Sequence, residues 1–232
     1  MISENLKEVH KKIEEAEKRG NRPCGSAKLI AVTKTKPVSD LWEAYHAGER
    51  EFGENKVQEL MDKQPQLPSD IKWHLIGHLQ TNKVKYVVGN TVLIHSVDSL
   101  KLAEEISKVA VKRNVNVDIL IEVNAALEES KFGLSLEETL PLVEAVAKLP
   151  NISIKGLMTI APFTEDAESN RKYFRALREL SVDIRSKNID NVCMDILSMG
   201  MTGDYEVAIE EGATYVRVGT GIFGMRRLDD SK

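Results

Sequence analysis

Residues 29–37 carry the sequence Leu-Ile-Ala-Val-Thr-Lys-Thr-Lys-Pro, in which a short apolar run ends in a polar turn. The run predicts a buried β-strand over Leu29–Val32, which Pro37 stops. Lys34 follows at the point where the strand meets the turn. A lysine there can lose part of its hydration, which frees the neutral amine to attack a carbonyl carbon. The alternative is an ordinary strand-end lysine whose ammonium group stays in water.

The same alternation of a short apolar run and a longer amphipathic stretch recurs along the chain. The predicted strands are Leu29–Val32, Glu51–Gly53, Trp73–Ile76, Val92–His95, Val117–Val123, Ile152–Leu157, Met194–Leu197 and Tyr215–Val218. The clearest helices between them are Asp98–Lys112, Ser135–Lys148 and Glu165–Lys187. No linker rich in Gly, Ser or Pro divides the 232 residues, so the pattern predicts an α/β fold in which residues 1–232 form a single (β/α)8 TIM barrel. An open doubly wound sheet is the alternative.

An extra N-terminal helix is predicted before the first strand. Its apolar positions recur at helical spacing, at Leu6, Val9, Ile13 and Ala16. Ser3 is the candidate cap for its start, and Gly20 is the candidate for its end. We expect this helix to cover the closed end or the flank of the barrel.

The composition narrows the class of protein. A net charge of −4 and the lack of basic runs interleaved with aromatic residues argue against nucleic-acid binding. The two cysteines, Cys24 and Cys193, form no CxxC motif and suit a reducing compartment without a disulfide. No signal peptide or membrane-spanning segment is predicted. We therefore expect a cytoplasmic monomer that does not bind membranes.

The residues that follow the predicted strands gather at one face if the fold is a barrel. Two late loops there are rich in small residues: Ser198 and Gly200 follow the seventh strand, and Gly219, Thr220 and Gly221 follow the eighth. Their backbone amides and hydroxyls can approach an anion closely, which suits a phosphate group. The alternative is that these glycines only allow tight connections.

Arg217 lies one residue before the end of the last predicted strand. The alternation of side chains along a strand places it with Tyr215 on the inner side of the barrel. It can then donate to a ring nitrogen or a phosphate, or form a structural ion pair with a buried carboxylate. His74 and His78 are a weak candidate for a metal site because no carboxylate or cysteine accompanies them, and we predict no metal.

Longer motifs occur along the chain in a fixed order. They comprise residues 31–37, Phe52-Gly53-Glu54-Asn55, residues 73–83, Gly156-Leu157-Met158, residues 197–201 and residues 216–224. Together they span nearly the whole chain and closely resemble the pyridoxal phosphate homeostasis protein family.

The resemblance implies a barrel similar to the N-terminal domain of alanine racemase, with pyridoxal 5′-phosphate (PLP) bound as an aldimine to Lys34. It implies that Asn55 and Met158 lie near the cofactor ring and that Arg217 faces the pyridine nitrogen. It also implies a set of residues that hold the phosphate, namely Ser198, Gly200, Gly219 and Thr220.

An arginine against the ring nitrogen affects the chemistry, because a guanidinium donates protons and does not accept them. The unprotonated ring is a poor electron sink, and no tyrosine matches the catalytic base of alanine racemase. We therefore predict a PLP-binding protein of vitamin B6 homeostasis with no catalytic residues, whose recipients are apo forms of PLP-dependent enzymes. A racemase-like enzyme and a Schiff-base aldolase are the alternatives. Lys131 is a candidate second amine that could accept the cofactor from Lys34.

Overall fold

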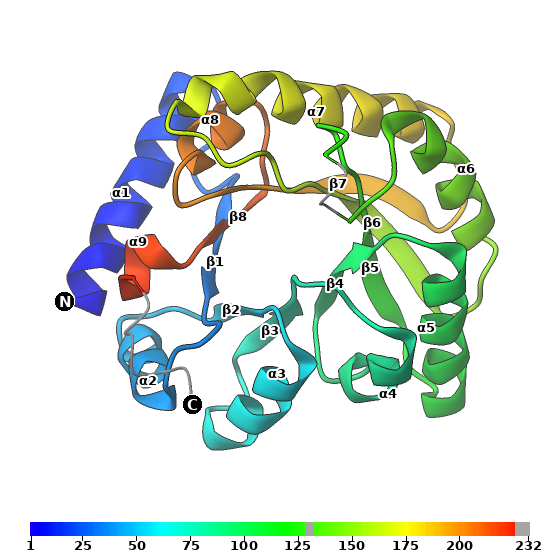
Figure 1. Ribbon diagram of the computed structural model, residues 1–232, viewed down its shortest axis with the longest axis horizontal. Helices are drawn as coiled ribbons and strands as arrows, with labels where there is room; N and C mark the ends of the chain where they lie inside the picture. Colours follow the sequence, from blue (N-terminus) through cyan, green and yellow to red (C-terminus); the bar gives the residue numbers. More distant parts are fainter. Residues whose placement is uncertain (129–131, 226–232) are drawn as a thin grey trace.

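Parallel strands close into a barrel in the order β1-β2-β3-β4-β5-β6-β7-β8, and β8 pairs with β1 (Figure 1). The strands are β1 (Lys28–Val32), β2 (Glu51–Glu54), β3 (Lys72–Leu75), β4 (Leu93–Val97), β5 (Val117–Glu122), β6 (Ile152–Met158), β7 (Val192–Met201) and β8 (Tyr215–Val218). This computed structural model describes residues 1–128 and 132–225. The closed sequential order confirms the predicted barrel and rules out the open doubly wound sheet.

The helices surround the strands (Figure 1). They are α1 (Ile2–Arg19), α2 (Val38–His46), α3 (Val57–Lys63), α4 (Val84–Val87), α5 (Leu100–Arg113), α6 (Leu136–Val146), α7 (Arg171–Ser186), α8 (Tyr205–Glu210) and α9 (Thr220–Phe223). Short 3₁₀ helices cover Gln64–Gln66, Thr81–Lys83 and Ala167–Asn170. The predicted helix over Glu165–Lys187 is therefore a 3₁₀ turn followed by α7.

Helix α1 lies on the flank of the barrel beside α8, α9 and α2 (Figure 1). Its predicted apolar positions are all buried. The helix ends before Gly20, as predicted, but the prediction of a Ser3 cap is wrong. The helix begins at Ile2, so Ser3 lies within its first turn and no side chain caps its start.

Strand β7 is longer than predicted. Its pairing with β6 includes Ser198, and its pairing with β8 continues to Met201. The register shifts between these residues, where Gly200 has a φ of +91° that favours glycine. Ser198 and Gly200 therefore belong to the strand and not to the loop that follows it.

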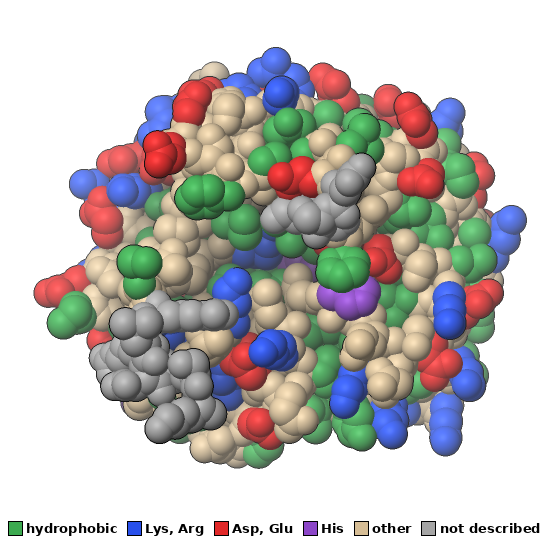
Figure 2. Space-filling view, viewed as in Figure 1, with side chains coloured by type: hydrophobic (Ala, Val, Ile, Leu, Met, Phe, Trp, Pro, Cys, Tyr) green, Lys and Arg blue, Asp and Glu red, His purple; other side chains and the backbone are tan. Residues whose placement is uncertain are grey.

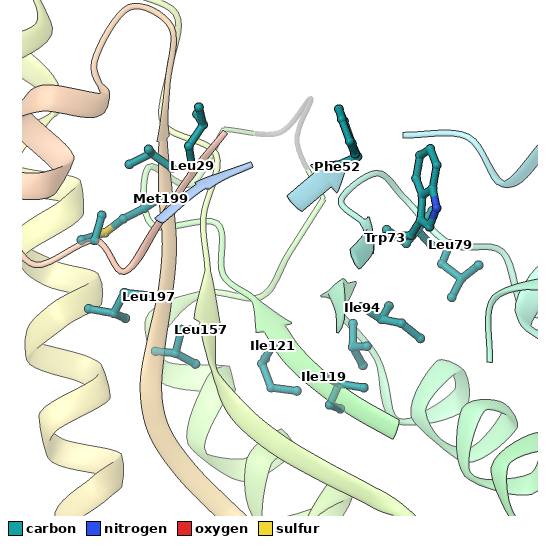
Figure 3. Packing of buried hydrophobic residues seen from close by; sticks show 14 of the residues in the cluster. Leu29, Phe52, Trp73, Leu79, Ile94, Ile119, Ile121, Leu157, Leu197 and Met199 are labelled. Carbon is teal, nitrogen blue, oxygen red and sulfur yellow. The ribbon is translucent and has the colours of Figure 1, made fainter. Parts of the chain in front are cut away.

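The main apolar core lies between the strands and the helices, and Figure 3 shows part of this layer. A second, smaller cluster contains Leu93, Leu120 and Met158, with Ile196 and Tyr215 packed against it. Because successive side chains of a strand point to opposite faces, this second cluster fills the inside of the barrel. Polar side chains share that interior, and they reach the functional site.

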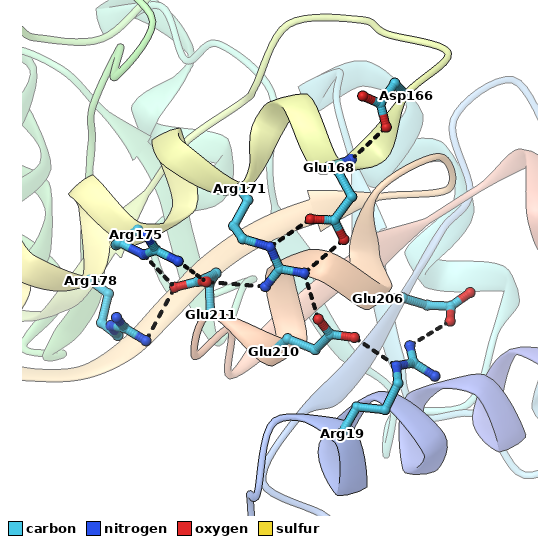
Figure 4. A network of polar contacts seen from close by, with 9 residues as sticks. All are labelled: Arg19, Asp166, Glu168, Arg171, Arg175, Arg178, Glu206, Glu210 and Glu211. Carbon is cyan, nitrogen blue, oxygen red and sulfur yellow. Dashed lines mark hydrogen bonds and ion pairs between the residues drawn. The ribbon is translucent and has the colours of Figure 1, made fainter.

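Charged residues join the outer helices (Figure 4). Arg171 at the start of α7 donates to Glu210 and Glu211 near the end of α8. Arg19 at the end of α1 donates to Glu206 and Glu210. The Arg171 contacts therefore join α7 to α8, and the Arg19 contacts join α1 to α8. Within the described ranges, no helix is both long enough and apolar enough to cross a bilayer.

Candidate functional site

A cavity of about 460 Å³ opens at the carboxyl ends of the strands. Its size falls within the usual range for small-molecule sites, about 300–1,000 Å³. Figure 2 shows a hollow near the centre of this face, with blue Lys or Arg side chains at its edge and deeper inside. The described lining residues are Val32, Lys34, Asn55, Ile76, Ile160, Pro162, Phe163, Thr164, Met201, Thr202, Gly203, Asp204, Arg217, Gly219 and Thr220.

The cavity brings together much of the predicted site. Lys34, Asn55, Arg217, Gly219 and Thr220 all line it, although they come from β1, β2, β8 and the turns that follow these strands. The cavity therefore combines an amine, an amide and a guanidinium with a glycine-containing turn.

The other three predicted residues are not among the described lining residues. Met158 is fully buried in the inner apolar cluster. Ser198 is also fully buried, and its hydroxyl bonds within the barrel. Gly200 packs against α8, where an added Cβ would lie 2.6 Å from the Cβ of Ala208. Met158 and Ser198 therefore lie inside the barrel, whereas Gly200 faces α8.

Lys34 is exposed in the turn that follows β1, so the expected partial burial of its side chain is not found. Its two neighbours in sequence are held firmly. Thr33 Oγ1 donates to Glu54 Oε1 at 2.6 Å, and the Thr35 amide donates to Glu59 Oε2 at 2.7 Å. Thr35 has a φ of +61°, which is unusual for a β-branched residue and typical of strained functional sites.

A buried ionic cluster of Glu54, Glu59 and Lys63 supports this turn. Lys63 Nζ donates to Glu54 Oε1 at 2.7 Å, Glu59 Oε2 at 2.8 Å and the carbonyl oxygen of Thr33 at 2.8 Å. Burial raises the pKa of Glu54 despite the attraction of Lys63. For Glu59, burial is outweighed by the hydrogen bonds from Lys63 and the Thr35 amide together with the charges of Lys63 and Lys56, so the pKa is lowered. The backbone around Lys34 is thus positioned by charges that do not touch the Lys34 amine.

Lys36 connects the same turn to α9. Its Nζ donates to the carbonyl oxygens of Phe223, Gly224 and Met225 at 3.1–3.3 Å. Two lysines of one short motif therefore have different environments: Lys36 binds the end of α9, whereas Lys34 faces the cavity.

Arg217 is 4% exposed and reaches the cavity from inside the barrel. Its Nη1 donates to Ser198 Oγ at 2.6 Å, and its Nη2 donates to the carbonyl oxygen of Thr159 at 2.8 Å. The described residues offer it no direct carboxylate partner, so the predicted alternative of a structural ion pair is not found there. Burial lowers the pKa of Arg217 to about 10, and Glu122 and Asp204 partly oppose that shift. The guanidinium remains charged at neutral pH.

Glu122, at the end of β5, is 4% exposed. Burial, reinforced by Asp98 and opposed by Arg217, raises its pKa to about 7. Its Oε2 has no hydrogen-bond partner among the described residues. Glu122 is therefore a carboxyl group that titrates near neutral pH close to the Arg217 side of the site.

The two histidines that were considered as a metal pair lie in different places. His74 Nε2 bonds to Glu51 Oε2 inside the barrel. The His78 ring stacks on Phe132 at a centroid distance of 4.0 Å. Their side chains do not form one site.

The segment that follows β7 also lines the cavity, although none of its residues was predicted from the sequence. Thr202 Oγ1 accepts from Thr220 Oγ1 at 3.1 Å and from the Gly221 amide at 3.4 Å, which places another hydroxyl beside the last turn. Gly203 and Asp204 also line the cavity. A threonine and a glycine directly after a strand were the available signal, but the strand was predicted to end too early.

Comparisons with known proteins give the family. The family model described as alanine racemase, N-terminal domain, matches residues 5–227. A pyridoxal phosphate homeostasis protein of Aquifex aeolicus is 48% identical over 225 residues, covering 97% of this chain and 98% of that protein. The chain belongs to the pyridoxal phosphate homeostasis protein family. The resemblance stated from the motifs is thereby confirmed.

Solved structures agree with this family assignment. PipY of Synechococcus elongatus, with PLP bound, is 35% identical and has a TM-score of 0.84, covering 97% of this chain and 100% of that chain. An unknown protein from Bifidobacterium adolescentis is 38% identical and has a TM-score of 0.91, covering 96% of this chain and 94% of that chain. Both structures therefore share this barrel over nearly the whole of this chain.

Proposed function

We propose that this protein binds PLP in the cavity and holds it as an imine of Lys34. The amine nitrogen would attack the aldehyde carbon, a C=N bond would form, and water would leave. The observation that carries the proposal is that Lys34 and Arg217 line one cavity together with Gly219 and Thr220. The family's name and the PLP bound in PipY support it.

The chemistry of the lining residues fits this cofactor. Asn55 Oδ1 is buried and has no hydrogen-bond partner among the described residues, as expected of a group completed by a ligand. Gly219, Thr220 and Thr202 offer backbone and hydroxyl groups to a phosphate. Arg217 can donate to the pyridine nitrogen and cannot accept from it. Met158 and Ser198 would then support the site from inside the barrel, and Gly200 would allow α8 to pack closely against β7.

The same residues favour storage of the cofactor over catalysis. An arginine at the ring nitrogen keeps the ring unprotonated, which weakens its use as an electron sink. No tyrosine is found among the described lining residues. The Asp204 carboxylate accepts from the Met201 amide and from Asn170 Nδ2, so its two oxygens are already engaged.

We therefore propose a role in PLP homeostasis without amino-acid conversion, with apo forms of PLP-dependent enzymes as recipients. We propose that the protein acts as a cytoplasmic monomer. The predicted transfer of the cofactor from Lys34 to Lys131 involves a residue outside the described ranges, and it stays a prediction.

The test compares Lys34→Ala with Lys28→Ala, a matched change at the opposite end of β1. After loading with PLP, the wild type and Lys28→Ala should show the visible absorbance of a protein-bound imine, and Lys34→Ala should lack it. Equal absorbance in Lys34→Ala would contradict the proposal. A wild-type protein that takes up no PLP but forms a reducible adduct with a phosphosugar would favour the aldolase alternative.

A second experiment separates storage from catalysis. The PLP-loaded protein is incubated with a panel of amino acids, and the products are followed by chiral chromatography. We expect no turnover above that of free PLP. Racemisation at an enzyme-like rate would overturn the homeostasis role and favour the racemase-like alternative.

A further inference from the structure

A chain of buried hydrogen bonds crosses the inside of the barrel. Starting at Arg217 Nη1, it runs to Ser198 Oγ at 2.6 Å and from Ser198 Oγ to His95 Nδ1 at 2.9 Å. It continues from His95 Nε2 to His74 Nδ1 at 2.9 Å and from His74 Nε2 to Glu51 Oε2 at 2.7 Å. We call these five residues the barrel relay. Strands β4 and β7 are not neighbours, so His95 and Ser198 can meet only inside the barrel.

The relay has one hydrogen-bond direction. Arg217 can only donate, so Ser198 Oγ accepts from it. At the other end an ionised Glu51 can only accept, so Nε2 of His74 carries a proton. A neutral His74 then accepts at Nδ1 from the Nε2–H of His95, and a neutral His95 accepts at Nδ1 from the Ser198 hydroxyl. The Glu51 end therefore fixes the tautomers of both histidines, and the bond that Ser198 Oγ accepts from Arg217 is compatible with them.

Burial supports these protonation states. His74, His95 and Ser198 have no exposed surface. Burial lowers the pKa of His74 despite its bond to Glu51, and it lowers the pKa of His95 well below the usual value. For Glu51, burial is opposed by the hydrogen bonds and charges of His74 and Lys72, which together lower the pKa. The relay therefore has a neutral middle between a cation and an anion.

Few other charged or titratable groups face the relay. Lys72 Nζ lies 3.2 Å from Glu51 Oε1, and Lys28 adds positive charge near His74. The Tyr215 ring meets the edges of both histidine rings, at centroid distances of 5.2 and 6.2 Å. Glu122 and Asp204 act on the Arg217 end. Glu51 is the first residue of β2, so the anionic end of the relay lies at the closed end of the barrel.

We propose that Ser198, His95, His74 and Glu51 are positioning residues for Arg217, and that this one-way relay links the cavity to Glu51 at the closed end of the barrel. That the oriented guanidinium serves the pyridine end of PLP rests on the proposed function. The relay replaces a direct carboxylate partner, so Arg217 is held in place while its charge remains unpaired at the cavity.

The first test needs no cofactor. Two-bond ¹H–¹⁵N spectra of the histidine rings report which nitrogen carries the proton. We expect both His74 and His95 to be neutral and protonated at Nε2 throughout pH 6–8. A charged ring, or a proton on Nδ1 of either residue, would overturn the relay.

The second test cuts the relay far from the cavity. Glu51→Leu removes the terminal acceptor, whereas Glu51→Gln keeps an oxygen that can accept from His74. We expect Glu51→Leu to give mixed tautomers at both histidines and to release PLP about tenfold faster, the size expected for a weakened hydrogen bond to a charged group. Glu51→Gln should restore the wild-type spectra and release rate. A folded Glu51→Leu protein with unchanged spectra and release would contradict the proposal.

A third comparison uses His95→Phe, which interrupts the centre of the relay, with Tyr215→Phe as the control. Tyr215→Phe keeps the ring against both histidines and should release PLP like the wild type. His95→Phe should release it about tenfold faster. If His95→Phe does not fold, the comparison of Glu51→Leu with Glu51→Gln still tests the relay.

Failure of the wild type and of every variant to bind PLP would refute the proposed function. The spectra of the histidine rings, which need no cofactor, would still test the relay.

Discussion

The two sides of the cavity are built on different buried polar groups. Beneath Lys34 lies an ionic cluster, in which Lys63 meets Glu54 and Glu59 at 2.7–2.8 Å. Beneath Arg217 lies the neutral middle of the barrel relay. The carboxylate of the relay, Glu51, stands at the opposite end from Arg217. On the first side the backbone is held and the Lys34 side chain is left exposed. On the second side the guanidinium itself is held.

This difference matches the task of each side. In the proposed function, the Lys34 amine forms and breaks a covalent bond, which benefits from mobility and access to water. The Arg217 guanidinium faces one ring atom in that proposal, which benefits from a fixed orientation. The cost of the first arrangement is a strained threonine, and the cost of the second is a buried cation.

The largest expected effect on stability comes from disrupting the ionic cluster beneath Lys34. Lys63→Met leaves the buried Glu54 carboxylate without its cation, and the free energy of unfolding should fall by about 3–5 kcal/mol. Chemical denaturation at pH 7 measures it. Lys56→Met, an exposed change just before α3, is the control and should stay within about 0.5 kcal/mol of the wild type. A loss below 1 kcal/mol in Lys63→Met would mean that the cluster is not a stabilising unit.

The second largest effect concerns Glu122, near the Arg217 side of the cavity, and it is a pH-dependent change in stability. Burial raises the pKa of the Glu122 side chain to about 7 in the folded protein. The stabilisation from the protonated carboxyl group is therefore complete below the ordinary pKa of a glutamate, and it is lost as the pH rises through about 7. The difference in the free energy of unfolding between Glu122→Gln and the wild type should therefore depend on pH. Between pH 4 and pH 8 it should shift in favour of the variant by on the order of 3 kcal/mol. Denaturant titrations at several pH values measure this difference. The exposed Glu144→Gln should show no such trend, and a pH-independent difference for Glu122→Gln would contradict the assignment.

The smallest effect concerns strain beside Lys34. Thr35→Gly removes the side chain from a residue with positive φ and keeps the amide that bonds Glu59. Relief of strain should slightly exceed the added flexibility of the unfolded chain, raising the free energy of unfolding by roughly 0.5 kcal/mol. Thermal unfolding can measure it. A clear destabilisation would show that the Thr35 side chain contributes more than its backbone strain costs.

The sequence predicted the barrel well because the strand pattern is regular and every strand is followed by a distinct polar turn. It also located Lys34 and Arg217, since each stands next to a recognisable strand end. The sequence did not predict the ionic cluster beneath Lys34 or the barrel relay. Lys63 and Glu59 lie within an ordinary amphipathic helix, and His95 is simply one polar residue of a predicted strand.

The missed residues have a common physical cause. The pairing of Ser198 with His95 and Arg217 depends on which strands face each other across the barrel, and sequence spacing does not contain that information. Strand β7 continues to Met201 through a register shift after Ser198, so Thr202 follows the strand and lines the cavity, whereas Ser198 lies within the strand. A glycine that looked like part of a phosphate loop instead allows α8 to pack closely.

We propose that Lys34 is the residue that holds PLP. The direct measurement is borohydride reduction of the PLP-loaded protein, followed by digestion and mass spectrometry of the modified peptides. We predict one stoichiometric phosphopyridoxyl group, located on Lys34 and absent from Lys36. Modification of Lys36 or another lysine in place of Lys34, or no modification of the loaded protein, would contradict it.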